Sequence, residues 1–206
     1  MEKKSTKSGV LRAVLLAAAL LCTGWTGSWQ QIRAAAKRVN AIRADFIQKK
    51  HMSILVHPLV STGRLDYRAP DNLRWEYLTP VSSLLLMHNG VVRRYFRIDG
   101  KLTQDAGLNT QAFNIVLQEI TQWLNGQFDE NPTFRARLGP GSQIVLVPRD
   151  KAFARMILRI EVNLARQPGI IRSVAIYEPG DSLTRLEFKN ITVNHPINDS
   201  VFRKSK

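Results

Sequence analysis

A mainly β fold is predicted for this chain of 206 residues. We expect one large curved antiparallel sheet, or open barrel, of about 10–11 strands with helices covering its open or concave side. Apolar and charged residues alternate over much of the chain, which is typical of strands with one apolar and one wet face. Turn residues interrupt this alternation about every 8–12 residues. Two segments instead repeat apolar residues at steps of three and four, as amphipathic helices do.

The first helical segment is predicted over residues 31–49. Its apolar residues would form one stripe that packs on the sheet, namely Ile32, Ala35, Val39, Ile42 and Phe46. The second is predicted from Asn109 to Phe128, with Gly126 as its stop signal. Its stripe consists of Phe113, Val116, Leu117, Ile120 and Leu124.

Strands are predicted between and after these helices. Leu65 and Tyr67 alternate with charged neighbours, and Leu73, Trp75 and Tyr77 do the same. Asn89-Gly90 is the strongest hairpin signal, joining residues 84–87 to 91–96. Later strands are predicted at Phe134–Leu138, Ile144–Val147, Met156–Leu164, Ile171–Tyr177 and Leu183–Val193. No linker or low-complexity tract divides them, so we expect residues 29–206 to form a single domain.

Residues 1–28 have the pattern of a secretory signal peptide. A basic start with Lys3, Lys4 and Lys7 precedes the apolar run 13–21, and small residues follow that run. The run is shorter than the ~20 residues that a membrane-spanning helix needs. We expect cleavage near residues 24–28 and export of the remaining chain to the periplasm.

Cys22, the only cysteine, comes directly after the apolar run. It either leaves with the signal peptide or carries a lipid anchor. A lipidated cysteine usually follows a small residue, whereas Leu21 stands here. A disulfide framework within the chain is excluded in both cases.

The chain is strongly basic, with 30 Lys and Arg against 16 Asp and Glu and a net charge of +14. Residues 1–28 hold four cations and one acid, so +11 remains without them. Such a charge can indicate nucleic acid as a partner. Export, and basic residues spread along helices and strands without an arginine-rich tail, argue against nucleic acid. The basic surface then meets solvent, anionic lipid or an acidic partner.

No pattern of catalytic or metal-binding residues is recognisable. His51, His57, His88 and His195 lack the spacing of a metal site, and neither a nucleophile elbow nor a phosphate-binding loop occurs. Carboxylate pairs are left open, since their spacing is spatial rather than sequential. The prediction is a protein that is not an enzyme and that uses no cofactor or metal.

Inward positions of the predicted elements are rich in aromatic and aliphatic residues. They would either fill a core or line a dry cavity inside the curved sheet. Such a cavity in an exported protein suits an acyl chain, because burial gains about 0.8 kcal/mol per CH₂, or roughly 12 kcal/mol for sixteen carbons. The candidate cavity residues are Phe46, Leu65, Tyr67, Leu73, Trp75, Tyr77, Leu84, Leu86, Phe113 and Leu117.

Several stretches together resemble a known family. Gly63-Arg64-Leu65 is followed by Pro70-Asp71-Asn72-Leu73-Arg74-Trp75-Glu76-Tyr77 with Pro80 behind it, and Glu178-Pro179-Gly180-Asp181 introduces the last strand. This order, over about residues 31–203, resembles the outer-membrane lipoprotein carrier family LolA, especially its divergent members.

The resemblance implies a half-open antiparallel β-barrel with a helical lid. It implies a soluble periplasmic shuttle that takes acylated lipoproteins from an inner-membrane release transporter to an outer-membrane receptor. Cavity residues of the family match Leu65, Tyr67, Leu73, Trp75 and Tyr77. We expect a monomer.

One position departs from the family. Better-known members carry an arginine just before the proline of the block, where it bonds lid residues and holds the cavity closed. Here that residue is Ala69, and Arg68 stands one place earlier. A shift of one residue along a strand turns the side chain to the other face, so Arg68 is not expected to replace the latch. Two alternatives stay open: a carrier of another lipid or glycolipid, and a lipid-anchored receptor or sensor held by Cys22.

Overall fold

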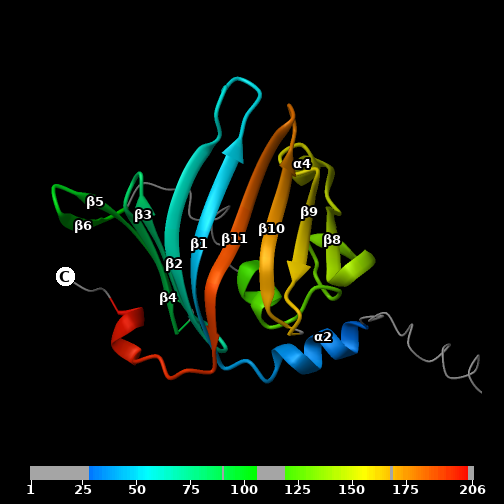
Figure 1. The fold of residues 1–206 in the computed structure, drawn as a ribbon, viewed down its shortest axis with the longest axis horizontal. Helices are drawn as coiled ribbons and strands as arrows, with labels where there is room; N and C mark the ends of the chain where they lie inside the picture. Colours follow the sequence, from blue (N-terminus) through cyan, green and yellow to red (C-terminus); the bar gives the residue numbers. More distant parts are fainter. Residues whose placement is uncertain (1–27, 90, 106–118, 168, 204–206) are drawn as a thin grey trace, which may run out of the picture.

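The computed structural model describes residues 28–89, 91–105, 119–167 and 169–203, and their strands form one antiparallel sheet (Figure 1). The eleven strands lie in the order β6-β5-β4-β3-β2-β1-β11-β10-β9-β8-β7. Their bounds are β1 (Ala41–His51), β2 (Leu59–Arg68), β3 (Asn72–Thr79), β4 (Ser83–His88), β5 (Val91–Ile98), β6 (Lys101–Gln104), β7 (Phe134–Leu138), β8 (Gln143–Pro148), β9 (Arg159–Leu164), β10 (Ile171–Glu178) and β11 (Ser182–Val193). This curved, open sheet confirms the predicted fold class.

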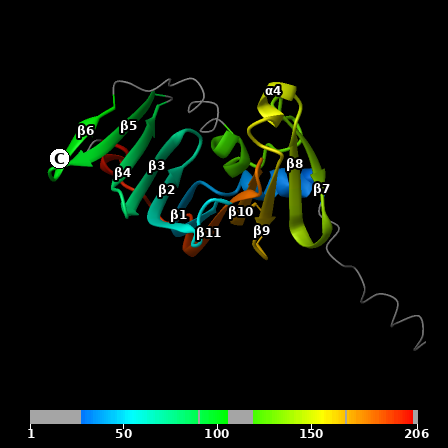
Figure 2. The same cartoon turned by 90° about the horizontal axis from the view of Figure 1, so that it is seen from above.

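Two wings of the sheet meet at its central strands, β1 and β11. β2 to β6 form one wing and β10 to β7 the other, and the sheet curves so that the wings stand on either side of a concave face (Figure 2). In the described part of the chain, β6 and β7 are the outer edges and do not pair with each other. The barrel is therefore half open, as the resemblance implies.

The two ends of the sheet differ. Helix α2 (Trp29–Ala36) lies at the end where β1 begins, which we call the proximal end (Figure 1). Ser28 caps this helix, accepting from the backbone N–H of Gln31, while the Gln31 side chain accepts from the backbone N–H of Ser28. The distal end is the opposite one, where β1 ends at His51 and β2 begins.

The predicted helix over residues 31–49 is wrong in its second half. α2 ends at Ala36, and β1 follows a short connection. Ile42 and Phe46 fit a helical stripe. Together with Ala44 between them, they also occupy every second position and so form one buried face of a strand. Pairing with β2 on one side and β11 on the other decides the outcome, because it satisfies both rows of backbone groups.

The second predicted helix is described only over its end. Residues 119–124 are helical, and the positive φ of Gly126 (74°) ends the helix as the sequence predicts. Residues 106–118, which include Phe113 and Leu117, lie outside the described residues.

The strand predictions hold with small changes of bounds. β4 and β5 pair as a hairpin around Asn89, and β7 has its predicted limits. β9 begins at Arg159 rather than Met156, because Asp150 caps a short helix, α4 (Lys151–Ala154), that precedes it. Neither α4 nor β6 is among the predicted elements.

The convex face of β2 to β4 is covered by the C-terminal segment, whereas the alternation predicts a wet face there. Phe202 is buried at the end of a 3₁₀ helix (Asp199–Phe202), and the Arg68 guanidinium lies 4.9 Å from its ring centre. Arg68 also donates to a carboxylate oxygen of Asp199 at 2.6 Å and to the Ile197 carbonyl at 3.3 Å. Arg68 therefore faces the convex side, as the one-residue shift predicts, while Ala69 packs against the main core.

Charged side chains pair with one another on the same convex face. Arg43 lies 2.6 Å from Asp66 between β1 and β2, whereas Arg74 and Glu76 lie 2.9 Å apart on β3 itself. These ion pairs engage part of the basic surface, both within a strand and between strands. No helix among the described residues is long and apolar enough to cross a bilayer.

Candidate functional site

An apolar cavity of about 250 Å³ lies on the concave face. Its walls come from both wings, from the helical residues 119–124 and from the segment around α4. The apolar lining residues are Leu65, Trp75, Tyr77, Leu84, Leu85, Ile120, Trp123, Leu124, Phe134, Phe153, Ile157, Ile160, Ile171, Val174, Ile176, Leu186 and Phe188. Only a few polar side chains join them, namely Gln48, Ser83, Arg94, Glu119 and Thr184.

The cavity lies mostly in the distal half of the concave face. Gln48 is near the end of β1, Ile176 near the end of β10 and Thr184 near the start of β11, and these ends all lie on the distal side. Tyr77 and Ser83, which face each other across β3 and β4, are distal as well.

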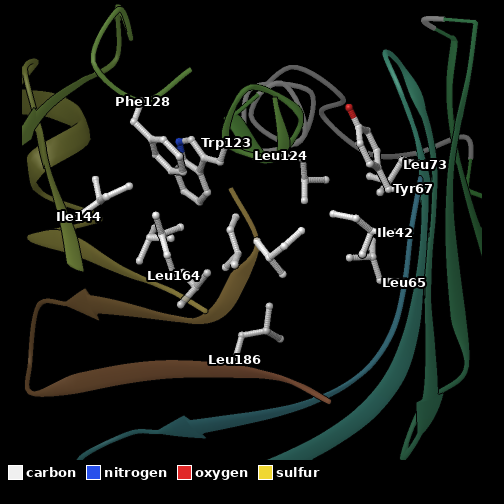
Figure 3. Close-up of a cluster of buried hydrophobic side chains, with 14 of the residues drawn as sticks. Ile42, Leu65, Tyr67, Leu73, Trp123, Leu124, Phe128, Ile144, Leu164 and Leu186 are labelled. Carbon is white, nitrogen blue, oxygen red and sulfur yellow. The ribbon is translucent and has the colours of Figure 1, made fainter. Parts of the chain in front are cut away.

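The proximal half of the same face is filled instead. Figure 3 shows Tyr67 and Leu73 of one wing facing Leu164 of the other, with Leu124 between the wings. Ile32 of α2 belongs to the same cluster and is buried. A core and a cavity thus share one continuous apolar surface.

Four aromatic rings support the cavity from the centre of the sheet. The Phe46 ring lies 5.0 Å from Trp75 and 5.1 Å from Tyr77, and Trp75 lies 6.1 Å from Phe188, measured between ring centres. These tilted and edge-on arrangements are favourable for aromatic pairs. Phe46 covers Gly63 of β2, where a Cβ atom would come within 2.3 Å of the ring. The glycine therefore leaves room for the ring to approach β2 closely and to pack against Trp75 and Tyr77.

Polar groups occur at a few points of the wall. The Tyr77 hydroxyl donates to Oε1 of Gln48 at 2.8 Å, and burial raises the pKa of Tyr77. The buried carboxylate of Glu119 accepts from Nδ2 of Asn131, which also donates to Gln122 at 3.1 Å. Such an arrangement can enclose an aliphatic chain and orient one polar end of it.

The structure brings some of the predicted cavity residues together and separates others. Leu65, Trp75 and Tyr77 line the cavity, and Phe46 lies behind two of them. Tyr67 and Leu73 belong to the filled proximal core. The hydroxyl of Tyr67 donates to Asn125 Oδ1 at 2.7 Å, and burial raises its pKa to about 12.

Leu84 and Leu86 occupy the face opposite to the expected one. Both pack in a separate cluster with Tyr95 and Leu102, although Leu84 also borders the cavity. Leu85 takes the inward position, because it pairs directly with Trp75 across β3 and β4. The expectation for Leu86 is therefore wrong. Phe113 and Leu117 lie outside the described residues.

Sequence reasoning missed the part of the wall that the second wing and the central strand β11 supply. Ile160 on β9, Val174 and Ile176 on β10, and Leu186 and Phe188 on β11 line the cavity. Ile160, Leu186 and Phe188 alternate with charged residues, and this alternation marks them as members of one face of their strands. The described residues hold no group of three or more His, Cys, Asp or Glu side chains that could bind a metal ion.

Comparison with protein families agrees with this architecture. Residues 37–205 match the model of the outer membrane lipoprotein carrier protein LolA. The chain belongs to the LolA family. No curated protein matches it in sequence.

Solved structures are similar to this chain at low sequence identity. An uncharacterized conserved protein from Thermus thermophilus has a TM-score of 0.52 and 13% identity, over 87% of this chain and 96% of that one. The LolA superfamily protein NE2245 from Nitrosomonas europaea has a TM-score of 0.43 and 8% identity, over 87% and 99%. A chain of the Pseudomonas aeruginosa MucA/MucB complex has a TM-score of 0.44 and 16% identity; this LolA-family chain is matched over 86% of its length and spans 60% of that one.

Proposed function

We propose that this LolA-family chain is a periplasmic carrier that binds the acyl chains of lipoproteins in its cavity and shuttles them from the inner to the outer membrane. In this proposal residues 1–28 are a cleaved signal peptide and residues 29–206 the single carrier domain. A release transporter at the inner membrane and a receptor at the outer membrane are its partners, and the carrier is a monomer. It performs no chemical reaction on its cargo.

The apolar cavity carries the proposal. Its wall is aliphatic and aromatic from both wings, and its few polar groups lie at separate points such as Gln48 and Glu119. A site of this kind holds a ligand by burying apolar surface rather than by specific hydrogen bonds. The cavity of about 250 Å³ is slightly smaller than common ligand pockets of roughly 300–1,000 Å³, so a long acyl chain requires the walls to move apart.

Identification of the cargo is the direct test. The protein is purified from a cell envelope without detergent, and bound hydrophobic molecules are analysed by mass spectrometry. Co-purifying acylated lipoprotein supports the proposal. Free lipid or glycolipid in its place supports the alternative cargo on the same fold, and an empty protein that also binds no acyl probe contradicts both.

Two substitutions on β3 test the site itself. Trp75→Glu places a charge at the apolar wall and should weaken binding of a fluorescent C16 fatty acid by more than about tenfold, since burying an unpaired carboxylate costs well over about 1.4 kcal/mol. Glu76→Gln, on the opposite face of the strand, is the matched control and should bind the probe normally. Equal loss in the two variants would show that the acyl chain does not bind on this face.

A variant that fills the cavity distinguishes loss of binding from loss of the fold. Val174→Phe places a ring into the cavity from β10 without adding a charge. Weaker probe binding is expected with a retained cooperative thermal transition. Unchanged binding would place the probe elsewhere on the molecule.

Lipid labelling of Cys22 tests the second alternative, a lipid-anchored receptor or sensor. Incorporation of labelled palmitate that is lost in Cys22→Ser would favour an anchored receptor or sensor over a soluble shuttle. We expect no incorporation, because Leu21 stands where a small residue usually precedes a lipidated cysteine.

A further inference from the structure

Exposed apolar side chains gather at one end of this molecule. Within the described residues, all the large apolar side chains that are exposed lie toward the distal end, except Val91 and Leu138. We call the distal group the distal rim; it comprises Ile54, Leu55, Val56, Leu59, Val60, Leu78, Val81, Ile98, Val147, Met156 and Leu158. A soluble surface ordinarily scatters such residues singly, so a concentration at one end indicates a contact surface.

The β1–β2 hairpin is the most prominent part of the distal rim. Its connection, residues 52–58, projects beyond the neighbouring strands at the top of Figure 1. Ile54 is 85% exposed and Val56 is 93% exposed, close to the maximum for their side chains. Moving the exposed aliphatic side chains of a projecting tip out of water lowers the free energy.

The rest of the distal rim adjoins the cavity. Met156 and Leu158 are exposed on either side of Ile157, which lines the cavity. On the other wing, exposed Leu78 directly follows Tyr77, which also lines it. The exposed apolar surface and the apolar cavity therefore lie in the same half of the molecule, away from α2.

Positive charge accompanies these side chains. Residues 49–60 contain Lys49 and Lys50 and no acid. Residues 149–159 contain four arginines or lysines against Asp150. Acids offset part of this charge: Glu178 lies 3.3 Å from Lys50 Nζ, Glu161 lies 2.9 Å from Arg159, and exposed Asp181 lies in the β10–β11 turn. Lys49, Arg149, Lys151 and Arg155 still outnumber Asp150 and Asp181 at this end. Anionic lipid headgroups attract a surface of this composition.

We propose that the distal rim docks on the surface of a bilayer that contains anionic phospholipid, with Ile54 and Val56 inserted between the lipids. Aliphatic tips flanked by lysines suit the boundary between headgroups and acyl chains. The inference rests on the proposed function in one respect: docking in this orientation brings the cavity to the membrane from which it takes, or to which it gives, an acyl chain.

A protein partner fits the distal rim less well. Stable protein interfaces bury about 800 Å² on each partner and are enriched in aromatic residues. The exposed large apolar side chains in the described part of the chain include no Phe, Tyr or Trp. The most exposed ones stand on a narrow hairpin, which penetrates a fluid surface more readily than it forms a broad interface.

The test is binding to vesicles of phosphatidylethanolamine with and without phosphatidylglycerol, measured by co-sedimentation. All samples carry Cys22→Ser, so that a lipid anchor makes no contribution. The rim variant is Ile54→Ser with Val56→Ser, and the matched control removes the two exposed apolar side chains of the proximal end, Val91→Ser with Leu138→Ser.

We expect the unaltered rim to bind vesicles containing phosphatidylglycerol, and the rim variant to bind them at least about tenfold more weakly, since each aliphatic side chain that enters an apolar phase contributes about a factor of ten or more. The proximal control should bind like the unaltered protein. Lys49→Gln with Lys151→Gln, both at exposed positions, should lose about fivefold per lysine, and the loss should disappear at high salt.

Several outcomes would overturn the inference. They are absence of vesicle binding, equal loss in the rim and proximal variants, or an unaltered rim that instead forms dimers or captures a protein through Ile54 and Val56. Binding of the fluorescent C16 fatty acid is measured in parallel, because Ile54 and Val56 do not line the cavity. A rim variant that loses vesicles but keeps the probe supports docking, whereas vesicle binding by a protein that binds no probe contradicts the proposed function alone.

Discussion

The proximal and distal halves of the concave face are built from the same strands and yet differ in packing. β2 contributes Tyr67 to the filled half and Leu65 to the cavity, and β3 contributes Leu73 and Trp75 in the same way. α2 covers the filled half, with Ile32 buried against the sheet. Alternation along a strand therefore produces an apolar wall, and the elements above the wall decide whether it becomes a core or a binding site.

One of the two largest effects is expected where the cavity depends on a close approach of two strands. In Gly63→Ala the new Cβ would lie 2.1 Å from the Glu76 carbonyl oxygen and 2.3 Å from the Phe46 ring. Because backbone must move, we expect a loss of about 3 kcal/mol in the free energy of unfolding. Denaturant unfolding measures it. Gly139→Ala is the control: its Cβ would meet the Gln143 side-chain oxygen at 2.8 Å, which can rotate away, so little loss is expected.

A pair of leucines compares the two halves directly. Leu73 and Leu85 lie on neighbouring strands, but Leu73 is fully buried in the filled half and Leu85 borders the cavity. Leu73→Ala should cost about 3–5 kcal/mol, because it opens a new void in a packed region. Leu85→Ala should cost at least about 1 kcal/mol less, since its side chain already adjoins empty space. Equal costs in urea unfolding would mean that the distal half is packed as tightly as the proximal half.

The pKa of Tyr67 shows whether the filled half excludes water. Burial raises its pKa to about 12, and the hydrogen bond to Asn125 opposes that rise. Because the folded pKa lies above the ordinary value of about 10, the stabilisation from neutral Tyr67 is complete below pH 10 and is lost as the pH rises through 12. Ultraviolet titration should show one tyrosine ionising near pH 12 that is missing in Tyr67→Phe. Ionisation of all tyrosines near pH 10 would contradict a dry proximal core.

The smallest effect concerns the C-terminal segment on the convex face. Hydrogen bonds from Arg68 and Arg203 lower the pKa of Asp199 below its ordinary value. A lowered folded pKa means that the stabilisation is present above about pH 4 and is lost as the pH falls through the folded value. Unfolding temperatures should therefore decline slightly more between pH 5 and pH 3 in the unaltered protein than in Asp199→Asn. An equal decline would show that this segment does not depend on the ion pairs.

Sequence patterns predict the sheet and its turns well, but they do not assign every face. Leu84-Leu85-Leu86-Met87 is apolar throughout, so nothing in it shows which leucines point inward. The register with Trp75 places Leu85 on the cavity side. The stretch around Ile42 and Phe46 likewise fits a helix and a strand equally, and only its two neighbouring strands resolve the ambiguity.

The sequence by itself determined the strand alternation, most of the turns, the displaced arginine at Arg68 and membership in the LolA family. These features are local, because a side chain's face follows from the period of two along its own strand. The tertiary structure decided that the apolar face is filled beside α2 and hollow at the distal end, and that bare aliphatic side chains gather near the hollow half. Both results depend on residues far apart in the chain, such as Leu65 of β2 and Ile160 of β9, which line one cavity only because the wings curve toward each other.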